Sequence, residues 1–147
     1  SFYIYWWISI WGASAEKYFI GPLIAISYFI IHFIFIENKI KEFYLLIICC
    51  TVGIIFENGL INLGFIEYKG IFTNNFGLAP LWVILLWGGF ALTLFHSFIF
   101  ILAKFRLSFF LGGLLTPIIY LSGHGMGALS LSFSLFNSYL ILSKFTI

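Results

Sequence analysis

The sequence predicts an all-α integral membrane protein: a bundle of about six transmembrane helices with short loops and both termini in the cytoplasm. Of the 147 residues, 63% are hydrophobic and only 8% are charged, whereas roughly a quarter of a soluble domain is charged. The mean hydropathy is +1.13. The stretch Gly77–Leu102 contains no Asp, Glu, Lys or Arg, and about 20 residues at about 1.5 Å each cross about 30 Å of hydrocarbon.

Breaks in the apolar pattern divide the chain into spans that form one transmembrane domain over residues 1–147. Each span ends at charged or turn-forming residues. These are Glu16-Lys17, the polar run 37–42, the hydrophilic stretch 67–75, Lys104 with Arg106, the glycine-rich link 123–127, and Lys144. The expected spans are residues 2–15, 18–36, 43–65, 78–102, 107–122 and 127–143.

The first and the sixth spans differ from the other four. The first is shorter than a full span and the chain opens at Ser1, so we expect that natural residues precede it. In the sixth, Ser130, Ser132 and Ser134 alternate with apolar residues, a pattern typical of a strand. A lone strand in lipid would leave its backbone groups unpaired, at several kcal/mol each, so we predict a helix there.

The basic residues predict the orientation. With six spans, both termini share one side with the loops at 37–42 and 104–106. That side holds five Lys or Arg residues and the other side holds two, Lys17 and Lys69. Since cytoplasmic loops carry the excess of Lys and Arg, the termini are predicted to be cytoplasmic.

Charge and composition exclude several classes of site. The net charge of +2 is scattered and forms no basic patch, so nucleic-acid binding is not expected. Cys49 and Cys50 lie in an apolar run and are interpreted as small packing residues. His32, His96 and His124 show neither i, i+4 pairing nor a nearby Cys, so no metal site and no cofactor are predicted.

Glu57 is the one acid placed well inside an apolar segment, and Asn58 follows it. A carboxylate at mid-bilayer costs at least about 2.5 kcal/mol on insertion scales, so it must protonate or find a partner. One interpretation is a proton-handling or ligand-binding group. The other, which the sequence favours, is a carboxyl near the helix end that bonds across the bundle. Gly53 shares its face and suits close approach of a neighbouring helix.

His96 shares a helical face with Trp82, Gly89 and Thr93. Such a stripe should face other helices rather than lipid. The histidine could handle protons or hold the polar end of a ligand, but an imidazole that joins helices by hydrogen bonds is the favoured interpretation. Ser97 cannot form a dyad with it, because i, i+1 side chains diverge on a helix.

The fifth span carries Thr116 and Tyr120 on one face, with Pro117 between them. Proline removes a backbone donor and frees a carbonyl for a hydroxyl or a ligand. Tyr120 could donate to His96 or to Glu57 if the helices meet. No catalytic residue is predicted. The candidate ligand-binding or inter-helix polar cluster comprises Glu57, Asn58, Trp82, Thr93, His96, Thr116 and Tyr120.

The runs Leu78-Ala79-Pro80-Leu81-Trp82, Leu86-Trp87, Phe90-Ala91, Thr93-Leu94 and His96-Ser97 resemble the central signature of the DUF2878 family of bacterial membrane proteins. The later Gly112-Gly113, Pro117, Tyr120, Gly123 and Gly127-Ala128 are similar to its second block. The resemblance spans nearly the whole chain. It implies a small multi-pass protein of the bacterial inner membrane, but it implies no activity.

Three functions remain open on the sequence. The favoured one is a non-catalytic protein that binds a lipid, a quinone or another hydrophobic ligand, or that belongs to a larger membrane complex. The second is a membrane-embedded lipid-modifying enzyme with His96 and Glu57 as an acid–base pair. The third is a proton-coupled transporter in which Glu57 titrates, although no convincing inverted repeat is present.

Overall fold

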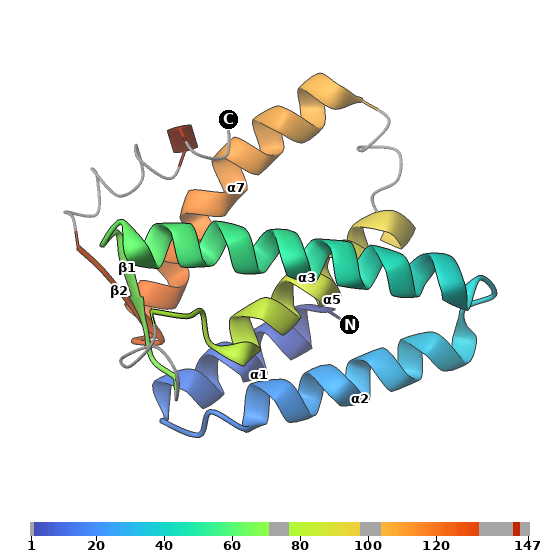
Figure 1. Ribbon diagram of the computed structural model, residues 1–147, viewed down its shortest axis with the longest axis horizontal. Coiled ribbons are helices and arrows are strands. Elements are labelled where there is room, and N and C mark those ends of the chain that lie inside the picture. Colours follow the sequence, from blue (N-terminus) through green and yellow to red (C-terminus); the bar gives the residue numbers. More distant parts are fainter. Residues whose placement is uncertain (1, 71–76, 98–103, 133–142, 145–147) are drawn as a thin grey trace.

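The computed structural model describes residues 2–70, 77–97, 104–132 and 143–144. In chain order, its elements are α1 (Phe2–Ser14), α2 (Ile20–Phe35), α3 (Lys39–Asn62), β1 (Ile66–Tyr68), α5 (Leu81–Ser97), α7 (Phe105–Gly125) and β2 (Leu129–Leu131) (Figure 1). The prediction of a mainly helical chain is therefore confirmed.

The helix α3 is long and apolar enough to cross a membrane. It has 24 residues, and its most apolar 18-residue window has a mean hydropathy of 2.0. Within the described ranges it is the one helix that meets this criterion, while α2 and the Leu81–Thr93 part of α5 are apolar but shorter. It begins at Lys39, earlier than the expected residue 43, because the Asn38 side chain accepts a hydrogen bond from the Lys41 backbone N–H at 3.3 Å. Glu42 therefore lies in the first turn of α3.

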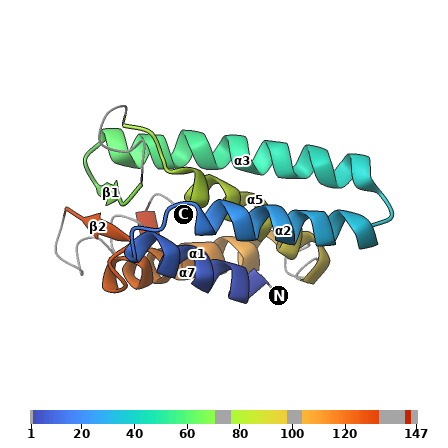
Figure 2. The ribbon, with the colours of Figure 1, turned by 90° about the horizontal axis from the view of Figure 1, so that it is seen from below.

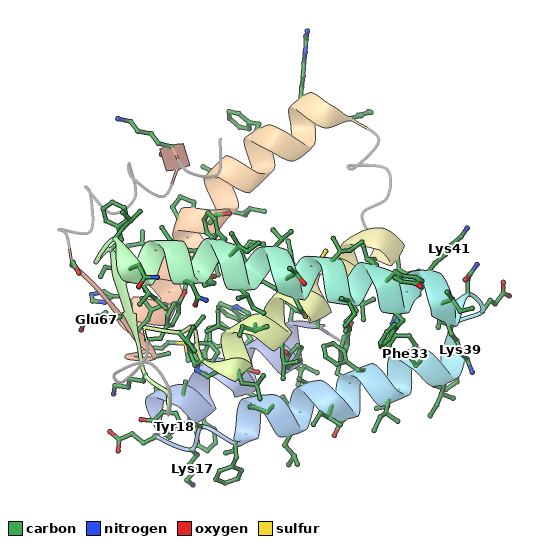
Figure 3. All side chains as sticks on the ribbon, in the orientation of Figure 1. Lys17, Tyr18, Phe33, Lys39, Lys41 and Glu67 are labelled. Carbon is green, nitrogen blue, oxygen red and sulfur yellow. The ribbon has the colours of Figure 1, made fainter. Side chains whose placement is uncertain are left out.

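The helices α2 and α3 run along the long axis of the molecule, and the bundle has two distinct ends (Figure 1). The turn between α1 and α2 lies at the same end as the β-strands, and the short connection from α2 to α3 lies at the opposite end (Figures 1 and 2). Figure 3 shows Lys17 and Glu67 at the first of these ends and Lys39 and Lys41 at the second. The helix α5 packs against α3, α2 and α1, and α1 also packs against α2.

Glycine allows α3 and α5 to approach closely. A Cβ atom on Gly53 of α3 would lie 2.5 Å from Cγ of Trp87 on α5, so only glycine fits against this indole. The expectation that Gly53 faces a neighbouring helix is thereby confirmed. On the other side of α5, a Cβ on Gly89 would lie 2.6 Å from the Tyr5 ring. These two contacts bring α1, α5 and α3 together.

Residues 129–131 form a strand, so the predicted helix is wrong over this part of the sixth segment. Here β2 pairs antiparallel with β1, with Ile66 opposite Leu131 and Tyr68 opposite Leu129. A helix is expected there only if the strand has no partner. The partner comes from the stretch after α3, and its backbone satisfies the groups that a lone strand would leave unpaired. Residues 133–142 of the predicted span lie outside the described residues.

Candidate functional site

The carboxyl group of Glu57 is the centre of a buried hydrogen-bonded cluster. Its side chain lies on α3 and the residue is 2% exposed. The Tyr120 hydroxyl donates to Oε1 at 2.5 Å, the Trp87 indole N–H donates to the same oxygen at 2.8 Å, and the Tyr68 hydroxyl donates to Oε2 at 2.6 Å. Each donor comes from a different element, namely α7, α5 and β1.

This arrangement makes Glu57 a structural junction. Burial, and after it the neighbouring Glu57 carboxylate, raises the pKa of the Tyr68 hydroxyl well above its usual value. Tyr68 therefore remains a protonated donor at neutral pH. Both carboxyl oxygens are engaged by donors, so the geometry corresponds to the interpretation in which Glu57 bonds across the bundle.

Three other residues of the predicted polar cluster, Asn58, Trp82 and Thr116, lie on segments that adjoin the Glu57 cluster. The Asn58 side-chain oxygen accepts from the Ala79 backbone N–H at 2.7 Å. The Trp82 indole N–H donates to the Lys69 carbonyl at 3.1 Å, and its ring lies edge-on to Tyr68. Thr116 is half-buried on α7, one turn before Tyr120. These residues fix the segments that flank β1 and the start of α5.

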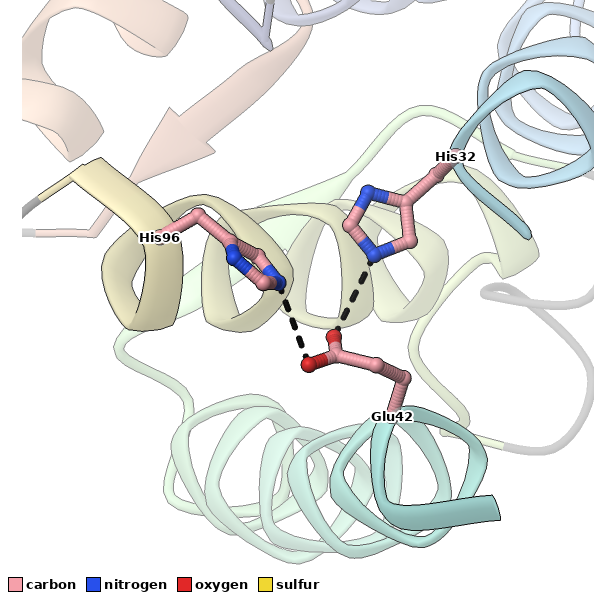
Figure 4. A group of neighbouring side chains, drawn as sticks. All are labelled: His32, Glu42 and His96. Atoms are coloured by element: carbon pink, nitrogen blue, oxygen red, sulfur yellow. Dashed lines mark hydrogen bonds and ion pairs between the residues drawn. The ribbon is translucent and has the colours of Figure 1, made fainter. Parts of the chain in front are cut away.

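His96 lies in a second cluster, with Glu42 and His32 (Figure 4). Its Nε2 atom is 3.1 Å from Oε1 of Glu42, and Nε2 of His32 is 3.2 Å from Oε2. The side chains of His32 and Glu42 are 15% and 11% exposed, whereas that of His96 is 43% exposed. One carboxylate thus bridges two imidazoles, and the cluster remains open on the His96 side.

Three helix ends bring this second cluster together. His32 lies in the last turn of α2, Glu42 in the first turn of α3 and His96 in the last turn of α5. Thr93, one turn before His96, donates to the Gly89 carbonyl at 2.9 Å and shares a hydrogen bond with the Tyr28 hydroxyl at 3.1 Å. The hydrogen bond between Thr93 and Tyr28 joins α5 to α2, about one turn before the two histidines.

A groove of about 400 Å³ adjoins the two histidines. Its lining is mostly hydrocarbon and aromatic, and it consists of Tyr28, Ile31, His32, Phe35, Ile36 and His96. The polar atoms of the imidazoles lie at one part of an otherwise apolar wall.

The structure therefore separates the predicted polar residues into two places. Glu57 lies fifteen positions after Glu42, which is about 22 Å along α3 at about 1.5 Å per residue. Tyr120 bonds to Glu57, one of the two partners considered for it, while His96 bonds to Glu42. The candidate cluster predicted from the sequence includes neither Glu42 nor His32. Their spacing is the signal that could have identified them. Glu37 lies in the short connection between two antiparallel helices, and His32 and Glu42 lie five residues before it and five residues after it.

The comparison with known families is consistent with the resemblance in the sequence. The family model described as "Protein of unknown function (DUF2878)" matches residues 1–144. No curated protein and no solved structure matches the chain.

Proposed function

We propose that this chain, which belongs to the DUF2878 family of proteins of unknown function, is a multi-pass membrane protein that binds a lipid or another hydrophobic ligand without transforming it. The groove beside His32 and His96 is the observation that carries this proposal. It favours ligand binding over a purely accessory role in a larger complex, because it offers a shaped apolar surface with a polar part.

The surface of the helices supports a membrane location. Only 17% of the apolar window of α3 is buried inside the protein, whereas the core helix of a soluble protein is mostly buried. Large apolar side chains are exposed along α2 and α3: Leu23, Ile26, Ile30, Ile31, Ile34, Ile47, Ile48, Val52 and Ile55. In water, the burial of apolar surface is favoured by about 25 cal/mol per Å². Molecules with so much exposed apolar surface would therefore aggregate in water. Lipid is the solvent that suits it.

The charges support the orientation with the α2–α3 connection in the cytoplasm. Lys39 and Lys41 lie at that end and Lys17 and Glu67 at the opposite end (Figure 3), and the expected five-to-two excess of Lys and Arg on the side of the α2–α3 connection favours this orientation. With the positive-inside rule, we propose that the histidine cluster lies near the cytoplasmic face of a bacterial inner membrane. A six-span bundle with cytoplasmic termini remains our proposal for the whole chain.

The two other functions find less support in the geometry. An acid–base pair of His96 and Glu57 needs the two groups within hydrogen-bond reach, but they bond to different partners. A carrier that uses Glu57 as its titrating group needs this carboxyl to exchange with an aqueous path. Its three donors and 2% exposure favour a fixed structural role instead.

The test is to purify the full chain in a mild detergent and identify the bound lipids and quinones by mass spectrometry. Ile31→Trp places an indole in the groove, while Ile30→Trp is a matched control, since Ile30 and Ile31 are 57% and 58% exposed and only Ile31 lines the groove. We expect one ligand class to be retained by the wild type and by Ile30→Trp. The amount of this ligand retained by Ile31→Trp should be at least about five-fold lower, which corresponds to a loss of ~1 kcal/mol in binding free energy. Equal retention by both variants, or a wild type without ligand, would contradict the proposal.

A further inference from the structure

We propose that His32, Glu42 and His96 form a binding site for one divalent transition-metal ion, with Zn²⁺ as the best-matched ion. The site uses residues of the groove wall, but it does not require the hydrophobic ligand. It rests on the positions and chemistry of the three side chains, which come from the ends of three different helices.

The spacing of the donor atoms suits a four-coordinate ion. One ligand atom from each of the three residues lies within 4.8 Å of the others. The contacts from the two Nε2 atoms to the Glu42 oxygens are 3.1 and 3.2 Å. Zinc bonds of about 2.0–2.1 Å in a tetrahedron separate neighbouring ligand atoms by about 3.3 Å. Small side-chain movements would therefore admit the ion between the imidazoles and the carboxylate.

The donor types select the class of ion. Two imidazole nitrogens and one carboxylate form the set found in open Zn²⁺ and non-haem Fe²⁺ sites. Magnesium and calcium prefer oxygen ligands, and one carboxylate is too few for a protein cage around either. With two neutral imidazoles and one carboxylate, the complex of a divalent ion has one net positive charge. A water or an anionic ligand can then bind to the ion.

The helices hold the ligands in advance of binding. Glu42 lies in the first turn of α3, where its backbone N–H donates to the Asn38 carbonyl at 3.3 Å. The His32 ring stacks on Tyr28 with their centroids 6.4 Å apart, and its centroid is 5.3 Å from that of His96. Because rigid elements carry all three groups, little conformational entropy is lost when an ion binds.

The fourth coordination position of a bound ion would open onto the groove. His96 is exposed and both histidines line the groove wall. Three protein ligands with one open position are typical of sites at which a metal holds water or a substrate, in contrast to closed structural sites with four protein ligands. Here the open position would take a water or the polar oxygen of a groove-bound molecule.

The experiment is a metal titration of the purified full chain after chelator treatment. Zn²⁺ is measured by competition with a chromophoric chelator, and Co²⁺ by its visible absorption in a tetrahedral site. We expect one ion per chain. His32→Ala, His96→Ala and Glu42→Gln should each weaken binding by at least about 100-fold, since loss of outer-shell partners alone costs 10–100-fold. His124→Ala is the matched control and should bind as the wild type does, because His124 lies near the Leu129 carbonyl instead.

Three outcomes of the titration would overturn the proposal: no binding by the wild type, wild-type binding by the His96→Ala variant, or equal weakening by His124→Ala. Zinc X-ray absorption on the wild type needs no variant and should show imidazole and oxygen ligands. A sulfur shell would assign the ion to Cys49 and Cys50 and would also refute the site. Failure of the metal titration leaves the lipid test intact, because Ile31→Trp alters the groove without removing any of the three ligands.

Discussion

The Tyr120 hydroxyl donates a hydrogen bond of 2.5 Å to the carboxyl of Glu57, although 63 positions separate the two residues in the sequence. The bond joins α7 to α3. With the donors from Trp87 and Tyr68, it links four elements through one side chain. The buried carboxyl of Glu57 therefore joins α7, α5 and β1 to α3 by hydrogen bonds.

Loss of the Tyr120 hydroxyl should destabilise the fold. Tyr120→Phe removes one donor from a buried carboxyl, and we expect a loss of about 1–3 kcal/mol in the free energy of unfolding. Tyr44→Phe is the control, since Tyr44 is 64% exposed and Tyr120 only 6%. Unfolding of the purified protein in detergent, followed by circular dichroism, measures both. Equal stabilities of the two variants would show that Glu57 does not hold α7 in place.

Gly53→Ala should separate α3 from α5. Its Cβ would meet the Trp87 ring at 2.5 Å, and such overpacking costs about 1–3 kcal/mol. The added methyl also pushes the indole away from Glu57, so the loss should include part of that hydrogen bond. Gly59→Ala provides the comparison on the same helix. A Cβ there meets nothing within 4 Å, and alanine should stabilise the helix by about 0.5–1 kcal/mol. A thermal unfolding series decides the sign of each change.

The proposed topology places Lys17 and Lys41 on opposite sides of the membrane. In a Cys49→Ala, Cys50→Ala background, we expect Lys17→Cys to react with a membrane-impermeant maleimide in intact spheroplasts. Lys41→Cys should react only after the membrane is opened, because it lies at the other end of the bundle (Figure 3). Reaction of both from the same side would refute a spanning arrangement, and the reverse pattern would invert the orientation.

Much of the helical structure could be predicted from the sequence, because apolar runs and the polar breaks between them are local. The predicted breaks at Glu16-Lys17 and at residues 37–42 do separate α1, α2 and α3. The sequence predicts the start of α3 too late, since three of the four residues 39–42, Lys39, Lys41 and Glu42, are charged. Polarity excludes them from lipid but not from a helix that Asn38 caps.

Contacts between distant segments were beyond sequence reasoning. Glu57 and Tyr120 were each identified, but only packing could decide that Tyr120 reaches Glu57 and not His96. The strand at 129–131 does not follow from the sequence, because two of the three residues of its partner β1 lie in the hydrophilic stretch 67–75, whose polarity indicates a connection. Glu42 was assigned to a polar connection, so its position between two histidines became visible only once the three helices were assembled.

The pairing of β1 with β2 also sets an order of events during synthesis. Ile66 leaves the ribosome long before Leu131, its partner, so β1 has no ladder while α5 and α7 are being made. Because a contact of such high sequence separation forms late, we expect α2, α3 and α5 to assemble first. The β1–β2 pair then forms after these helices, once the nascent chain has supplied β2.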